Sequence, residues 1–249
     1  MKNLDNFIIT ELKEYAITNR YEEVCGLISI SNDEQKFIKI KNIASNKNKF
    51  FLMNPDDVEK CYLKYNISYC FHSHLNSRGF SSEDISSSLN SGLSYIMYSI
   101  PEDKFHFFDA KKYFFYKKYI NLPYINGIND CWGIIGKFLN EQEKIPISDP
   151  EKNRYNFKDE DLSWDYEIRK KWMEENNLKK ITVKRIDDLK PLDIIVGKSK
   201  NEEYATFGCL MLENNLILLQ NQRQRSKIES FRKGYFKMID YVARFEDLK

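Results

Sequence analysis

Two of the three histidines in this chain stand two residues apart, at His72 and His74, directly after an apolar run. Alternate residues of a β-strand point to the same side, so this spacing lets two imidazoles converge on one metal ion. Asp84 follows ten residues later and supplies a carboxylate as a third ligand. Three protein ligands leave the fourth position of a zinc ion for water, which is typical of catalytic zinc. The spacing therefore predicts a catalytic zinc site at these three residues.

Hydrolysis at such a site needs a group that takes up and delivers protons. Glu23 is the candidate, because it precedes an apolar run, 24–28, that we expect to pair with the histidine-bearing strand. Its neighbour Glu22 is the alternative. Ser81 is predicted to donate a hydrogen bond to the developing oxyanion. The Ser81-x-x-Asp84 spacing is also close to that of a helix capping box, which is a purely structural interpretation.

Three segments resemble, in their order, the signature of the JAMM (MPN-type) zinc metallopeptidases: Glu23-Val24-Cys25-Gly26, His72-Ser73-His74 and Ser81-x-x-Asp84. The resemblance implies zinc held by His72, His74 and Asp84. It also implies that Glu23 is the general base and acid and that Ser81 assists the tetrahedral intermediate. The chain departs from the usual pattern at Leu75, where the family has proline, and the gap from His74 to Ser81 is one residue shorter.

The second half of the chain has a cysteine at a predicted helix start. Asp130 is the expected N-cap, and the helix dipole favours the thiolate of Cys131. The segment 129–135 resembles the nucleophile helix of the NlpC-type cysteine peptidases, and segments 189–195 and 207–212 resemble the strands that follow it in that family.

That family carries its catalytic histidine at the equivalent of Phe207 or Thr206, yet the last histidine of this chain is His106. Gln220 or Asn221 stands at the third polar position, and neither replaces a general base. The sequence therefore predicts a degenerate cysteine site at Cys131, in a domain that is catalytically inactive.

The order of the two domains resembles the tail assembly protein K family of lambda-like bacteriophages. That resemblance implies other phage tail-tip proteins as partners, and peptidoglycan cross-links or a ubiquitin-like domain of a tail protein as substrate. It places the protein in the host cytoplasm during assembly or at the virion tail tip. A non-catalytic structural tail-tip protein is the alternative, and a host-derived, deubiquitinase-like enzyme is a third reading that leaves the C-terminal half unexplained.

The elements that must position these residues follow from apolar periodicity and turn signals. Helices are expected at 7–19, from an Asn54 cap to Tyr65, and after Ser81; Gly26 is expected to allow close backbone approach at the site. Asn214-Asn215 is expected to form a hairpin turn. Strands are expected at 24–30, 36–43, 67–71, 94–100, 104–108, 193–196, 207–212 and 216–219. The pattern predicts an α/β (α+β) fold, and the two resemblances imply a mixed-sheet JAMM/MPN-type domain, 1–112, and a papain-like NlpC-type domain, 113–249.

Composition sets outer limits on the function. With 42% apolar residues the chain has enough for folded cores, and a net charge of +2 gives no electrostatic footprint for nucleic acid. We expect no membrane span and no signal peptide, hence synthesis in the cytoplasm. Five cysteines without a CxxC pair argue against a disulfide framework, so buried thiols are expected. His106, between two phenylalanines, is interpreted as structural.

Overall fold

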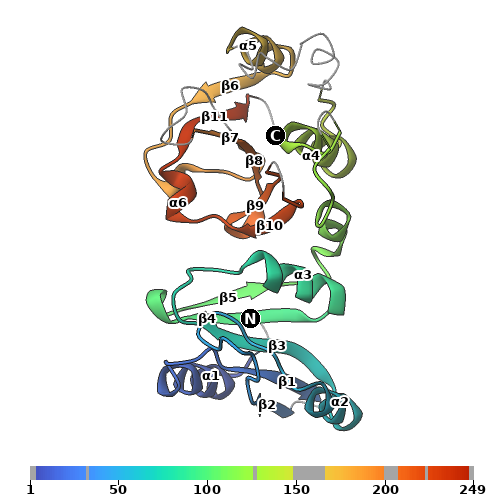
Figure 1. Ribbon diagram of the computed structural model, residues 1–249, viewed down its shortest axis with the longest axis vertical. Coiled ribbons are helices and arrows are strands. Elements are labelled where there is room, and N and C mark those ends of the chain that lie inside the picture. The colour runs from blue at the N-terminus through green and yellow to red at the C-terminus, as the bar shows by residue number, and fades with distance from the viewer. Residues whose placement is uncertain are drawn as a thin grey trace. The chain divides into compact units, whose positions relative to one another are not determined.

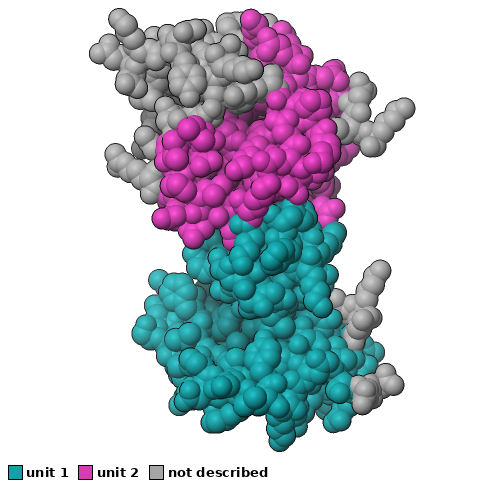
Figure 2. Space-filling model, turned by 90° about the vertical axis from the view of Figure 1, so that its right-hand side faces the viewer, with its two compact units in different colours: residues 1–117 teal, residues 118–249 magenta. Residues whose placement is uncertain are grey.

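The computed structural model describes residues 4–31, 34–125, 128–147, 166–198, 207–221 and 224–246. The fold is α+β, as predicted, with two sheets and flanking helices (Figure 1). The chain forms two compact units, residues 1–117 and 118–249, which Figure 2 shows in two colours. The boundary predicted from the sequence followed residue 112.

Unit 1 contains a five-stranded sheet with the histidine-bearing strand at its centre. The strand order is β2-β1-β3-β4-β5, and only β3 and β4 are parallel to each other. A parallel pair needs a crossover connection, which α3 provides, so the end of β3 leads directly to the start of α3. The strands are β1 (Cys25–Ser31), β2 (Glu34–Ile40), β3 (Ile67–His74), β4 (Ser94–Ser99) and β5 (Lys104–Phe108).

Two helices of unit 1, α2 and α3, begin directly after their predicted caps, and α1 begins one residue before its predicted start at 7. The helices are α1 (Asn6–Thr18), α2 (Pro55–Lys64) and α3 (Ser82–Ser91). Asn54 caps α2 by accepting a hydrogen bond from the Asp56 N–H. The buried residues of α1, Ile8, Leu12 and Ala16, are spaced by four and pack on one face of the sheet with Phe71 and Ile96, in the core of the unit.

The opposite face of this sheet carries the candidate site. Since side chains alternate along a strand, His72 and His74 point away from Phe71 and hence away from α1. Gly26 does not face the site as expected. A Cβ at Gly26 would lie 2.5 Å from Ile38 O and 2.6 Å from the Phe37 ring, so its close approach serves packing beside α1.

Unit 2 contains a six-stranded sheet in the order β10-β9-β8-β7-β11-β6, and every pair in it is antiparallel. Asn214 and Asn215 both have positive φ in the connection from β8 to β9, which confirms the predicted hairpin turn. The strands are β6 (Leu178–Ile181), β7 (Ile194–Gly197), β8 (Phe207–Met211), β9 (Leu216–Leu219), β10 (Lys227–Ser230) and β11 (Ile239–Phe245).

The helices of unit 2 include α4 (Cys131–Phe138), α5 (Tyr166–Glu175) and α6 (Lys233–Phe236). Asp130 caps α4, as predicted, by accepting hydrogen bonds from the N–H groups of Trp132 and Gly133. A π-helical turn, Leu139–Glu143, extends α4. Among the described residues, no helix combines the length and apolar character needed to cross a bilayer.

The five cysteines are all free thiols, and four of them are buried. This confirms the expectation from their spacing. Burial raises the pKa of Cys25 to about 12, so that thiol stays protonated at neutral pH.

Candidate metal centre

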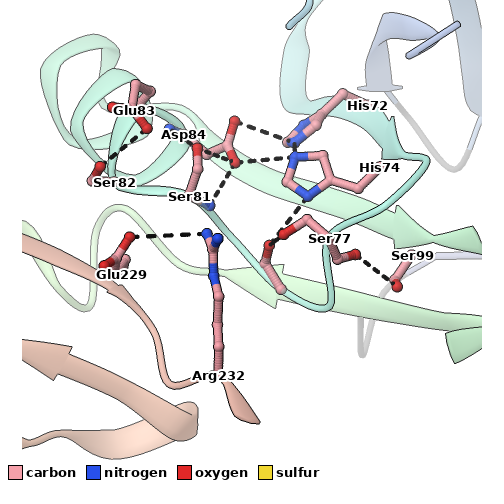
Figure 3. A network of polar contacts seen from close by, with 11 residues as sticks. His72, His74, Ser77, Ser81, Ser82, Glu83, Asp84, Ser99, Glu229 and Arg232 are labelled. Atoms are coloured by element: carbon pink, nitrogen blue, oxygen red, sulfur yellow. Dashed lines mark hydrogen bonds and ion pairs between the residues drawn. The ribbon is translucent and has the colours of Figure 1, made fainter. Parts of the chain in front are cut away.

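The two histidines lie at the carboxyl end of β3, and the aspartate lies in the first turn of α3. His72 Nε2 is 3.1 Å from His74 Nε2. Asp84 Oδ1 is 3.3 Å from His72 Nε2, and Asp84 Oδ2 is 3.2 Å from His74 Nε2. Figure 3 shows both imidazole rings turned toward this carboxylate. The structure therefore brings the three residues together as a buried group that can hold a metal ion.

The spacing of these atoms fits a single cation. In a tetrahedral zinc site with bonds of about 2.0 to 2.1 Å, neighbouring ligand atoms are about 3.3 Å apart. The observed separations are 3.1 Å between the two Nε2 atoms and 3.3 and 3.2 Å from them to the two different oxygens of Asp84, and one ligand atom from each residue lies within 4.8 Å of the other two. Lone pairs on these atoms repel one another unless a proton or a metal ion lies among them. The group therefore has the geometry and the electrostatics of a cation site.

A second layer of contacts orients the two rings. His74 Nδ1 lies 3.1 Å from Gly79 O, so this nitrogen is an N–H donor, and Nε2 is the nitrogen that can bind a metal ion once it is deprotonated. Aromatic rings surround His72, which is fully buried: Phe51 stacks on it at 4.5 Å, and Tyr95 and Phe80 lie at 5.8 and 6.1 Å. Within the described part of the chain, His72 Nδ1 has no hydrogen-bond partner.

Burial and mutual charge set the protonation of the group. Burial lowers the pKa of His72. Although burial opposes it, the charge of His72 and hydrogen bonds from both histidines hold the pKa of Asp84 well below its ordinary value. Burial by itself would lower the pKa of His74. Hydrogen bonding to Asp84 outweighs this effect, so the pKa of His74 is raised. Protons therefore compete with a metal ion for this position.

Glu23 lies on the same face of the sheet as the histidines. The Ser73 N–H donates to Val24 O at 2.9 Å, and the Val24 N–H donates to Ser73 Oγ at 3.0 Å. The antiparallel register of β1 and β3 continues through this pair, so Glu23 falls beside His74.

The two candidate glutamates have different surroundings. Glu23 is 5% exposed, and desolvation raises its pKa to about 7, with His74 lowering it and Asp84 raising it by smaller amounts. Among the described residues, none forms a hydrogen bond with the Glu23 carboxylate. The side chain of Glu22 is 38% exposed and forms an ion pair with Lys47 at 3.3 Å.

Ser81 forms the capping box that its spacing predicted. Its hydroxyl accepts a hydrogen bond from the Asp84 N–H at 3.1 Å and donates to Asp84 Oδ2 at 2.7 Å, while its own N–H donates to the same oxygen at 2.8 Å. A hydroxyl can donate one hydrogen bond, and the hydroxyl of Ser81 donates its hydrogen bond to Asp84. Assistance to an oxyanion, which stays a prediction, would need that proton to change partner.

Sequence reasoning missed two residues that support the site. Asn42 is 3% exposed and donates to the backbone of Glu23, and Phe51 covers His72. Neither residue stands in a local pattern that predicts this role, because each acts on a residue at least 19 positions away. His106, on the edge strand β5, lies with Nε2 at hydrogen-bond distance, 2.9 Å, from Glu102 Oε2 and is not part of the metal group.

The cysteine site of unit 2 has a different arrangement. Cys131 is half-buried at the start of α4, which packs on β8. A Cβ at Gly208 would contact Trp132, so position 208 faces α4, whereas Phe207 packs with the core on the other face. Thr206 lies outside the described residues. Gln220 is 1% exposed and donates to Gln224 O at 3.0 Å, and Asn221 follows it.

In comparisons with known proteins, the chain matches no protein-family model and no curated protein sequence. Its function is therefore inferred from its residues and their geometry.

Proposed function

We propose that unit 1 is a zinc-dependent peptidase or isopeptidase domain of the JAMM type. The observation that carries the proposal is a buried His72–His74–Asp84 group with atoms 3.1 to 3.3 Å apart and a buried glutamate on the same sheet face. Two imidazoles and one carboxylate suit zinc better than magnesium or calcium, which prefer oxygen ligands. When bound, zinc supplies Lewis acidity toward water and the scissile carbonyl.

Glu23 is the proposed proton carrier of this site. It accepts a proton from the attacking water and delivers that proton to the nitrogen of the scissile bond, so that the C–N bond breaks with a neutral amine as the leaving group. A pKa raised to about 7 by burial suits both steps at neutral pH. Glu22 is less suited, because its half-exposed carboxylate already pairs with Lys47.

The proposed setting is a bacteriophage tail tip or tail-assembly complex, on the resemblance to the tail assembly protein K family. Substrates of the right chemistry are peptidoglycan cross-links or a ubiquitin-like domain of another tail protein. In this proposal all hydrolysis belongs to unit 1, because no histidine follows His106 and Gly208, which faces α4 from β8, has no side chain that could act as a base.

A structural tail-tip role without catalysis is the second candidate. The observation that favours it is the cysteine site of unit 2, which keeps Cys131 at a helix start but lacks a base. Metal content separates the two candidates, since the structural role does not require a metal ion.

The test is metal analysis of the purified chain, followed by turnover of peptidoglycan and of candidate tail proteins before and after chelation. Glu23→Gln should leave zinc bound at saturating concentration and lower turnover at least about 1,000-fold, because the proton carrier is lost. Glu22→Gln is the matched control, and Cys131→Ser should also retain full activity. Zinc-free protein, or cleavage that a chelator does not inhibit, would contradict the proposal.

A further inference from the structure

The segment between β2 and α2, residues 42–53, runs past the metal-binding group, and we term it the 42–53 loop. Its two ends are joined by a bridge between Asn42 and Met53 and by the hydrogen bond from the Ile43 N–H to Leu52 O at 2.8 Å. The loop therefore closes on itself at its base and is a defined part of unit 1.

This loop holds the backbone of Glu23 from both sides. The Glu23 N–H donates to Lys47 O at 2.7 Å, and Asn42 Nδ2 donates to Glu23 O at 2.7 Å. Glu23 stands just before β1, where sheet hydrogen bonds with β2 have not yet begun. The loop thus supplies contacts to this residue that the β1–β2 ladder does not.

Asn42 uses every hydrogen-bonding position of its side chain. Besides Glu23 O, its Nδ2 group donates to Phe50 O at 2.9 Å. Its Oδ1 atom accepts from the Ala44 N–H at 2.9 Å and from the Leu52 N–H at 3.0 Å. A buried amide with four protein partners fixes the positions of all four backbone groups relative to one another.

Two of those partners flank Phe51, the residue stacked on His72 with an angle of 23° between the rings. Asn42 thereby connects the proposed proton carrier on one side with the ring that covers a metal ligand on the other. We infer that Asn42 is a positioning residue, which holds Glu23 and Phe51 beside the histidines of the metal group. The inference rests on the proposed function, since positioning matters only if the site binds metal.

A merely structural role predicts that loss of Asn42 lowers stability and leaves the electrostatic link between Glu23 and the metal unchanged. A positioning role predicts that this link weakens. The distinction is measurable as a coupling between two substitutions, Asn42→Ala and Glu23→Gln, in the affinity for Zn²⁺.

The experiment is competition calorimetry with Zn²⁺ on four full-length proteins: wild type, N42A, E23Q and the double variant. In the wild-type background, E23Q should weaken Zn²⁺ binding by about tenfold, because a nearby negative charge is lost. In the N42A background the same change should weaken it by less than about threefold. Ser94→Ala is the control, because it removes another buried hydrogen bond of unit 1, to the Ala110 N–H; in that background the full effect of E23Q should remain.

An undiminished effect of E23Q in the N42A background would overturn the inference and leave the proposed function intact. Failure of the wild-type protein to bind Zn²⁺ would overturn the proposed function and the inference with it.

Deuterium exchange provides a decisive measurement if N42A does not fold. In the metal-free wild-type protein the amides of Ala44 and Leu52, which donate to Asn42, should exchange at least about 100-fold more slowly than the exposed-loop rate. Exchange of both amides at the exposed-loop rate would also overturn the inference, because Asn42 would then not hold the loop.

Discussion

Glu22 and Glu23 are neighbours in the chain, and the tertiary structure gives them opposite properties. Glu22 is half-exposed and paired with Lys47, while Glu23 is buried beside His74. Sequence position alone left both as candidates for the base. The assignment of the base depends on which of the two glutamate side chains faces the histidines. The hydrogen bonds between Val24 and Ser73 set the strand register, and this register turns Glu23 toward the histidines.

The raised pKa of Glu23 predicts a pH-dependent stability of the metal-free protein. Its pKa is about 7 in the folded chain and near 4.5 in the unfolded chain, so folding favours the protonated form. The contribution of Glu23 to stability should therefore fall as pH rises from about 4.5 to 7 and stay level above that range. Glu23→Gln removes this penalty and should stabilise the metal-free protein more at pH 8 than at pH 5, by about 1 to 3 kcal/mol.

Urea unfolding of chelated protein at the two pH values measures this difference. Any cost of burying the glutamine amide is the same at both pH values and cancels. Glu22→Gln should show no such pH dependence, because that residue is half-exposed. An equal gain for E23Q at both pH values would show that Glu23 is ionised in the folded metal-free protein.

At the scale of elements, unit 1 uses the point where a parallel pair is connected. The end of β3 delivers two histidines on one face, and the first turn of α3 places Asp84 opposite them. Residues just beyond the carboxyl ends of parallel strands commonly form binding sites for this reason. Ser81 caps the same helix and forms a hydrogen bond with the same carboxylate. The contacts that start α3 therefore also hold Asp84 in the metal group.

In unit 2, the turn that leads into β7 is strained. The Asp193 N–H donates to Lys190 O at 3.1 Å, with Pro191 second in the turn and Leu192 third, at a φ of +71°. This is the geometry of a type II turn, which favours glycine at the third position. In the Pro-Gly-Asp segment of the NlpC-type peptidases, which residues 191–193 resemble, the third position of this turn is glycine.

Leu192→Gly is therefore expected to stabilise unit 2 by about 0.5 to 1 kcal/mol, because relief of the left-handed strain exceeds the entropic cost of glycine. Thermal unfolding measures the change. Lys190→Gly in the same turn is the control and should destabilise the unit, since it adds unfolded-state freedom without relieving strain. Destabilisation by Leu192→Gly would mean that its half-buried side chain contributes more than the strain costs.

At the scale of the whole chain, the two units depend on different buried charges. The metal group lies entirely within unit 1. In unit 2, Arg244 donates two hydrogen bonds of 2.6 Å to Asp193, which is 1% exposed. Neither charge cluster shares a residue with the other.

Calorimetry of the full chain should accordingly separate two responses. Zn²⁺ at about 100 times its dissociation constant should stabilise one transition by about 2.7 kcal/mol, since it binds only folded unit 1. Asp193→Asn should lower the other transition by about 3 kcal/mol, because it leaves Arg244 without its buried partner. A single transition that responds equally to both changes would show that the units unfold together.

Local spacing in the sequence was sufficient to pair His72 with His74, to predict the caps at Asn54, Ser81 and Asp130, and to predict the strands around the site. The histidine pair and the caps depend on residues two or three apart, and strand and helix geometry fix such distances wherever the chain folds. Asp84, ten residues beyond His74, was found from the motif resemblance and the capping spacing. β6, β10 and β11 escaped prediction: β6 and β10 have only four residues each, and the alternation of β11, Ile239–Phe245, is interrupted by consecutive buried residues.

Only the tertiary structure decided which side chains surround the candidate metal group. The choice of Glu23, the orientation of Gly26 toward Phe37, and the four contacts of Asn42 all depend on strand register and on a loop path. Such contacts join residues up to 49 positions apart, as in the hydrogen bond from Val24 to Ser73. No local periodicity encodes them, because they exist only once the sheet has assembled and water has left the face that carries the histidines.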